Sequence, residues 1–198
     1  MTTDANHVTL SLSKGGLETL AQTLRPSTVA VHDERAGGSG SGVVWDARGL
    51  IVTNAHVVSS RNPIVVFADG RRVRAALVGR DPERDLAALR LPRGLEAHLD
   101  AAGVRDSATL VPGELVVAVG NPHGIAGAVT AGIVHRCNAR WVVADVRLAP
   151  GNSGGPLADA AGRVAGINSM IARGLALAVP SAAVARFLRA LGEDARAA

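Results

Sequence analysis

The sequence predicts an all-β protein made of two barrels of about six strands each, followed by a short C-terminal helix. Short apolar runs of about four to eight residues recur along the chain, separated by turn residues. The 198 residues include 23 glycines but only two tryptophans, two phenylalanines and no tyrosine, so we expect an aliphatic core and frequent turns. Only the last apolar run has helical spacing.

The strands of the first barrel are predicted from its apolar runs. The turn Asp69-Gly70 and the alternating polarity of residues 72–75 indicate a hairpin. The runs cover residues 27–31, 42–45, 50–54, 63–67, 71–78 and 85–91. We therefore expect an N-terminal barrel over about residues 20–98.

The second half repeats this pattern after a break. Residues 92–112 contain proline and glycine with little strand pattern, so we expect them to join the barrels. The later runs cover residues 114–120, 126–135, 140–146, 163–170 and 176–180. They predict a C-terminal barrel over about residues 106–180, within a single domain that spans residues 1–198.

A closing helix is predicted over residues 181–191. Pro180 and Ser181 are start signals, and Gly192 is a stop signal. Between them, the apolar residues at helical spacing are Val184, Phe187, Leu188 and Leu191. This helix has one apolar face to bury.

Composition and charge exclude several classes of protein. The net charge is +4, and arginines alternate with acids, as in RDPERD at 80–85. This is typical of a solvated surface, so we expect no nucleic-acid partner. The single Cys137 excludes an intrachain disulfide or a cysteine zinc site. His7, His32, His98 and His135 show no ligand spacing, so we expect no metal and no cofactor.

The N-terminal residues are polar and include Asp4, where a secretory signal would have a basic start and an apolar run. No stretch approaches the ~18 apolar residues of a membrane helix. We therefore expect no membrane partner and a cytoplasmic location.

Two polar residues end or begin predicted strands. His56 lies in TNAHVV at 53–58, where an imidazole could act as a general base, although a lone histidine is more often structural. Asp85 opens the run DLAALRL, where a carboxylate could orient the histidine ring. Asp81 and Glu83 lie too near to be excluded, but the apolar run that follows favours Asp85.

The segment GNSGGPL at 151–157 is the most specific motif. Glycines near Ser153 allow a sharp backbone turn and leave the hydroxyl unobstructed. The N–H groups of Gly151 and Ser153 could then bind the oxygen of a tetrahedral intermediate. An ordinary glycine-rich hairpin is the alternative. His56, Asp85 and Ser153 occur in the chain order of a base, an orienting acid and a nucleophile.

With these motifs the chain resembles the trypsin-fold serine proteases, and among them the HtrA (Deg) group. The resemblance covers roughly residues 20–190. It depends on GSGSGVVWDARGLIVTNAHVV, DLAALRL, VAVGNPHG, VTAGIV, APGNSGGPL, GINS and ALAVP. It implies Greek-key barrels and a serine endopeptidase that acts on extended or unfolded polypeptide. Because the chain ends shortly after the predicted helix, we expect a protease domain without a PDZ domain.

The resemblance also implies roles for further residues. Gly151, Asn152 and Ser153 form the oxyanion hole, and Ser169 in GINS binds the catalytic aspartate. Ser169, Met170 and Ile171 provide the strand on which a peptide substrate pairs. Residues 145–150 line the pocket for the side chain before the scissile bond.

Two questions stay open at this stage. Either Arg147 enters the specificity pocket and favours an acidic or hydrogen-bonding side chain, or it points outward while Leu148 lines an apolar pocket. The chain could also be a catalytically silent peptide-binding module, or a latent protease whose oxyanion segment needs a partner to order it. The sequence supports no particular oligomeric state.

Overall fold

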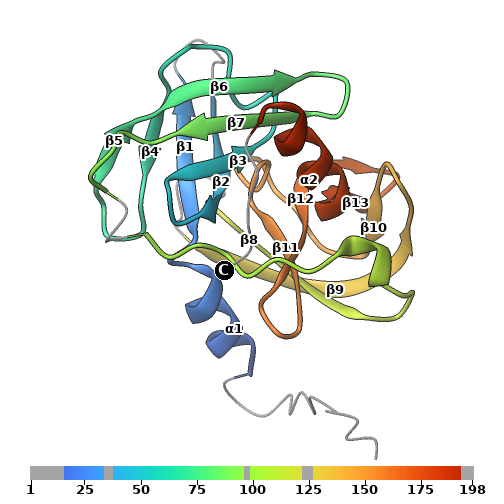
Figure 1. Cartoon of the computed structure of the whole chain (residues 1–198). Helices are drawn as coiled ribbons and strands as arrows, with labels where there is room; N and C mark the ends of the chain where they lie inside the picture. Colours follow the sequence, from blue (N-terminus) through green and yellow to red (C-terminus); the bar gives the residue numbers. More distant parts are fainter. Residues whose placement is uncertain (1–15, 34–37, 96–98, 122–126, 193–198) are drawn as a thin grey trace, which may run out of the picture.

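The computed structural model describes residues 16–33, 38–95, 99–121 and 127–192. They form two antiparallel sheets and two α-helices (Figure 1). The predicted all-β class is confirmed. Helix α1, Gly16–Leu24, precedes the first sheet and buries Leu20, Ala21 and Leu24. This helix was not predicted, because its apolar face is only a few residues long.

The first sheet has seven strands in the order β5-β4-β1-β2-β3-β7-β6. The strands are β1 Thr28–Asp33, β2 Gly38–Asp46, β3 Leu50–Thr53, β4 Ile64–Val66, β5 Arg72–Arg74, β6 Ala76–Asp81 and β7 Leu86–Arg90. Strands β5 and β6 lie at opposite edges, yet only Ala75 separates them in the chain. The sheet must therefore curl into a half-barrel. The predicted run 71–78 is thus one strand broken at the buried Ala75, which donates from its N–H to the Pro63 carbonyl.

The second sheet closes into a six-stranded barrel, with the order β10-β13-β12-β11-β8-β9. The strands are β8 Leu115–Gly120, β9 Ala128–Cys137, β10 Val142–Ala144, β11 Pro156–Asp159, β12 Val164–Ala172 and β13 Leu175–Pro180. Small aliphatic side chains such as Ala118, Val142 and Ala178 pack together in a buried cluster of this barrel. Strand β11 was missed, because it begins at a proline directly after two glycines.

Another apolar cluster joins the two sheets. Val43 and Leu86 of the first sheet pack with Val117 and Ile167 of the barrel. Helix α2, Ser181–Ala190, adds Phe187 and Leu188 to this cluster and contacts both sheets (Figure 1). The predicted closing helix is therefore confirmed. No helix in the described part of the chain is long and apolar enough to cross a membrane.

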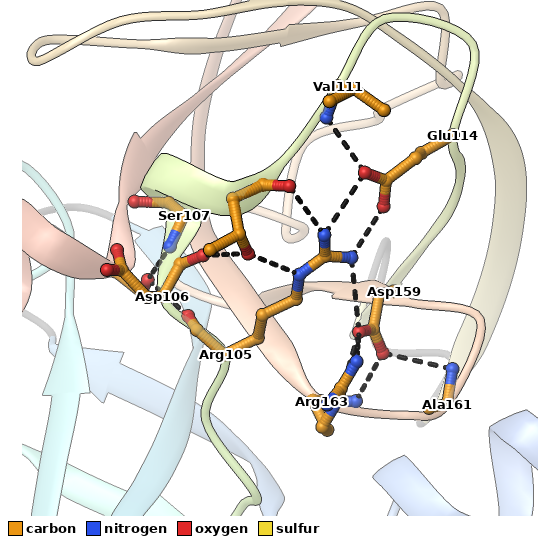
Figure 2. A network of polar contacts seen from close by, with 10 residues as sticks. Arg105, Asp106, Ser107, Val111, Glu114, Asp159, Ala161 and Arg163 are labelled. Carbon is orange, nitrogen blue, oxygen red and sulfur yellow. Dashed lines mark hydrogen bonds and ion pairs between the residues drawn. The ribbon is translucent and has the colours of Figure 1, made fainter. Parts of the chain in front are cut away.

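The segment between the sheets is fastened to the barrel by charged side chains (Figure 2). Arg105 pairs with Glu114 at 2.5 Å and lies 3.5 Å from Asp159, which also binds Arg163. The Arg105 carbonyl accepts a hydrogen bond from Ser181 at the start of α2. This network ties the linking segment to the second barrel and to the start of α2.

Candidate active site

His56 follows β3 on a turn at the surface. Its Nδ1 lies 2.9 Å from both carboxylate oxygens of Asp85, and its backbone N–H donates to the same carboxylate at 3.1 Å. With Asp85 accepting at Nδ1, the neutral ring leaves Nε2 free to accept a proton. Half of the His56 side-chain surface is exposed, so Nε2 can be reached from outside.

The turn that carries His56 is held by residues that the sequence did not single out. Arg80 donates to the carbonyls of Ala55 and Val58, on either side of His56, at 2.9 and 3.2 Å. The side-chain amide of Asn54 donates to the Asp85 carbonyl at 2.9 Å. These contacts join β6 and the start of β7 to the turn. They could not be found from spacing, because Arg80 and Ala55 are 25 positions apart.

Asp85 is the acid that contacts the histidine. Its backbone is left-handed, with φ of 56°, a conformation that aspartate tolerates better than most residues. Burial alone would raise the pKa of Asp85, but the hydrogen bonds from His56 and Ser169 outweigh it and hold the pKa below its ordinary value. Asp81 instead pairs with Arg84 at 2.7 Å, and Glu83 is exposed. Of these three acids, Asp85 is thus the one that contacts His56.

Ser169 connects the acid to the serine. It occupies a register shift of β12 between Asn168 and Met170, and such a bulge re-aims a side chain. Its hydroxyl donates to Asp85 at 2.5 Å, while its carbonyl accepts from the Ser153 hydroxyl at 3.0 Å. His56, Asp85, Ser169 and Ser153 therefore form one continuous chain of contacts. Among described residues, the Ser153 hydroxyl bonds to Ser169 and not to His56.

The backbone around Ser153 has two unused donors. Gly151 has φ of +103°, and the Asn152 N–H donates to the Ala149 carbonyl at 3.0 Å. The N–H groups of Gly151 and Ser153 have no hydrogen-bond partner in the described part of the chain. They are free to bind an external oxygen, whereas the Asn152 N–H is already engaged.

The end of β12 offers an open strand edge. Met170 and Ile171 are 45% and 54% exposed. Among the described strands, β12 here pairs with β13 alone, because its pairing with β11 ends at Ile167. An extended peptide could pair with the other edge.

The two residues weighed for the specificity pocket differ in environment. Arg147 is exposed and makes no ion pair with any described residue. Leu148 is half-buried and packs against the apolar cluster of the barrel. Residues 16–33, 38–95, 99–121 and 127–192 contain no group of three metal-ligating side chains. His7 and His98 lie outside the described residues.

Comparison with known proteins identifies the fold and its relatives. Residues 40–167 match the family model of the trypsin-like peptidase domain. A DegP-like periplasmic serine endoprotease of Halomonas elongata is 38% identical over 164 residues, which are 75% of this chain and 34% of that protein. A protein of the same name from Brucella suis is 40% identical over 166 residues, 75% of this chain and 32% of that protein.

The serine protease HhoA of Synechocystis is 36% identical over 173 residues, 79% of this chain and 43% of that protein. The chain thus spans less than half the length of each of these relatives. These matches confirm the resemblance inferred from the motifs. The predicted cytoplasmic location is wrong, because relatives from two of these organisms are named periplasmic. An export signal is a removable segment, so the first residues of a sequence are a poor guide to the compartment.

Proposed function

Because this chain belongs to the trypsin-like peptidase domain family, we propose that it is a serine endopeptidase that cuts extended or unfolded polypeptide. The observation that carries the proposal is the chain of contacts His56–Asp85–Ser169–Ser153. It brings a base, a carboxylate and a nucleophile together from three separate segments. We assign the catalytic roles to His56, Asp85 and Ser153.

The proposed reaction begins when the Ser153 hydroxyl turns from the Ser169 carbonyl toward His56 Nε2. Such bonds are often loose before substrate binds, and rotation about the Cα–Cβ bond of Ser153 is the change that we propose. His56 takes the proton as Ser153 attacks the peptide carbonyl. Asp85, kept ionised by its lowered pKa, stabilises the imidazolium that forms.

The Gly151 and Ser153 N–H groups would then hold the developing oxyanion, while Asn152 shapes the turn through its bond to Ala149. His56 next gives its proton to the leaving amine, and the new amino terminus departs. Water attacks the acyl-enzyme on Ser153 with His56 again as the base. This second step restores the free serine.

The substrate is proposed to pair with the open edge of β12 at Ser169, Met170 and Ile171. Backbone pairing needs an extended chain, so unfolded segments are favoured over folded ones. The half-burial of Leu148 and the exposure of Arg147 support an apolar pocket for the side chain before the scissile bond. Because relatives are named periplasmic, we place the activity outside the cytoplasm.

A second candidate function is a latent or silent module that holds peptides without cutting them. It is favoured by the bond of the Ser153 hydroxyl to Ser169 instead of His56. The two functions share the same strand edge and differ only in whether Ser153 can react.

The deciding experiment is labelling with a fluorophosphonate, compared between wild type, Ser153→Ala and His56→Ala. The probe needs both an activated serine and an oxyanion hole. If the protein is a serine endopeptidase, wild type labels and digests casein, whereas Ser153→Ala and His56→Ala do not. Ser27→Ala, which loses a buried hydroxyl elsewhere, is the control and should label like wild type. A folded wild type that does not label contradicts the active enzyme. Labelling that then rises with added extended peptide indicates the latent form, and no rise indicates the silent one.

A further inference from the structure

One residue outside the proposed catalytic set contacts the backbone of residues 151–153, which carries the two free N–H groups. Ser41 lies on β2, is fully buried, and donates from its hydroxyl to the Gly151 carbonyl at 2.7 Å. Its backbone N–H donates to the Ser153 carbonyl at 2.7 Å. A single residue of the first sheet therefore holds two carbonyls of a segment that belongs to the second.

The direction of the Ser41 hydroxyl is fixed by its other partners. The backbone N–H of Asn121 donates to the Ser41 oxygen at 3.0 Å, and the side-chain amide of Asn121 lies 3.3 Å away. Because these groups donate, the Ser41 proton is left for the Gly151 carbonyl. The Ser41 carbonyl accepts from Thr53 at 2.6 Å, so the backbone of Ser41 is also held.

The contact with the Gly151 carbonyl holds the orientation of the peptide group that joins Gly151 to Asn152. This group lies between the N–H groups of Gly151 and Ser153 in the chain. A peptide group is planar, so the Gly151 carbonyl and the Asn152 N–H move together. Ser41 binds one end of this plane and Ala149 accepts from the other. The N–H groups of Gly151 and Ser153 lie on the two neighbouring planes. Their separation and relative orientation therefore depend on the plane that Ser41 holds.

We propose that Ser41 is a positioning residue that keeps the Gly151 and Ser153 N–H groups aligned for the oxyanion. This inference rests on the proposed function, because it concerns the same reaction. Ser41 does not touch the reacting atoms, and it acts through the Gly151 carbonyl. Its loss should therefore weaken binding of the transition state and not of the peptide.

The test is Ser41→Ala, with Ser27→Ala as the matched control. Ser27 is also buried, and its hydroxyl also donates to a carbonyl, that of Leu24, far from the site in the chain. On a tripeptide p-nitroanilide that ends in valine, we expect Ser41→Ala to lower kcat about 10- to 100-fold and to change KM less than about twofold. Ser27→Ala should change neither constant, although both variants lose thermal stability.

Two further readouts separate positioning from general damage. Affinity for a peptide aldehyde, which forms a tetrahedral adduct, should fall by the same factor as kcat. Affinity for a peptide can be measured without cleavage in Ser153→Ala and in the double variant Ser41→Ala/Ser153→Ala. The two affinities should be equal, because Ser41 is proposed to affect the transition state and not peptide binding. The midpoint of the pH–kcat profile should not move, because the contacts of His56 and Asp85 are untouched.

The possible outcomes distinguish the role of Ser41 from the proposed function. If wild type is active and both Ser41→Ala and Ser27→Ala have the kcat of wild type, the role of Ser41 is overturned and the proposed function stands. Wild type that neither labels nor cleaves overturns the proposed function and this inference with it. If Ser41→Ala does not fold, Ser41→Cys replaces the hydroxyl by a thiol, which is a much weaker donor to the Gly151 carbonyl. We then expect kcat to fall while KM stays the same, and an unchanged kcat would overturn the inference.

Discussion

The hydroxyl of Ser169 lies 2.5 Å from Oδ2 of Asp85, although the two residues are 84 positions apart in the chain. Strand β12 of the barrel thereby completes the environment of a carboxylate at the start of β7 in the other sheet. The same serine accepts a hydrogen bond from Ser153 through its carbonyl. One bulged residue thus fixes how the two halves of the site meet.

Removing the Ser169 hydroxyl should slow catalysis. Ser169→Ala takes away one of two side-chain hydrogen bonds to Asp85 and leaves the carbonyl contact to Ser153 in place. A hydrogen bond to a charged group is worth about 1.5–3 kcal/mol, so kcat should fall at least about 10-fold. Ser169→Thr keeps a hydroxyl and should recover most of the rate. Equal rates in wild type and Ser169→Ala would contradict the link.

Arg80 should matter for the rate through the turn that carries His56. Arg80→Met removes the hydrogen bonds to Ala55 and Val58 and should lower kcat several-fold. Unfolding should become easier by about 1–2 kcal/mol, measured in urea. Arg74→Met is the control, since Arg74 is exposed on β5 and its side chain makes no hydrogen bond with a described residue. If both variants behave alike, Arg80 does not position the turn.

Gly154 and Gly174 form a matched pair for testing how tightly the segment after Ser153 is packed. Both have positive φ, +86° and +81°, so an added Cβ costs similar backbone strain in each. At Gly154 that Cβ would lie 2.0 Å from the Ser41 carbonyl, whereas nothing lies within 4 Å at Gly174. Gly154→Ala should therefore be at least about 2 kcal/mol less stable than Gly174→Ala in urea unfolding. Equal losses would mean that the close approach is easily relieved.

The exposure of Arg147 predicts that it does not choose the substrate. In a peptide library varied before the scissile bond, wild type and Arg147→Ala should both favour small aliphatic residues. In the proposed apolar pocket Leu148 is a lining residue that packs against the barrel cluster. The larger side chain of Leu148→Phe should leave less room in that pocket, so the preference should shift toward alanine. A preference for glutamate that disappears in Arg147→Ala would show instead that the guanidinium enters the pocket.

The pair of Arg105 and Glu114 should make stability depend on pH (Figure 2). The hydrogen bond from Arg105 holds the pKa of Glu114 below its ordinary value. A lowered carboxyl pKa gives stability that is complete above the unfolded pKa, about 4.3, and is lost as the pH falls through the folded pKa. Glu114→Gln should cost about 1–2 kcal/mol at neutral pH and show a flatter decline below about pH 4.3. Glu83→Gln, at an exposed carboxyl, is the control. If stability falls equally with pH in both variants, the Arg105–Glu114 pair does not contribute to the pH dependence.

Much of the fold could be predicted because strands and helices depend on local spacing. The hairpin at Asp69-Gly70 and the helix after Pro180 appear as expected, since turn residues and apolar periodicity act within a few positions. Strand β11 and helix α1 were missed because a proline or a short apolar face gives little local signal. The split at Ala75 follows from the curl of the sheet, which puts β5 and β6 at opposite edges and which no local pattern encodes.

By itself, the sequence determined which chemical groups are present and on which elements they lie. The tertiary structure alone decided which of them meet. It put Asp85 against His56 and Asp81 against Arg84, joined the Ser153 hydroxyl to the Ser169 carbonyl, and set Ser41 against Gly151 across 110 positions. The physical reason is that hydrogen bonds act over about 3 Å, while the residues that form this site come from both sheets. Only folding brings them within that distance.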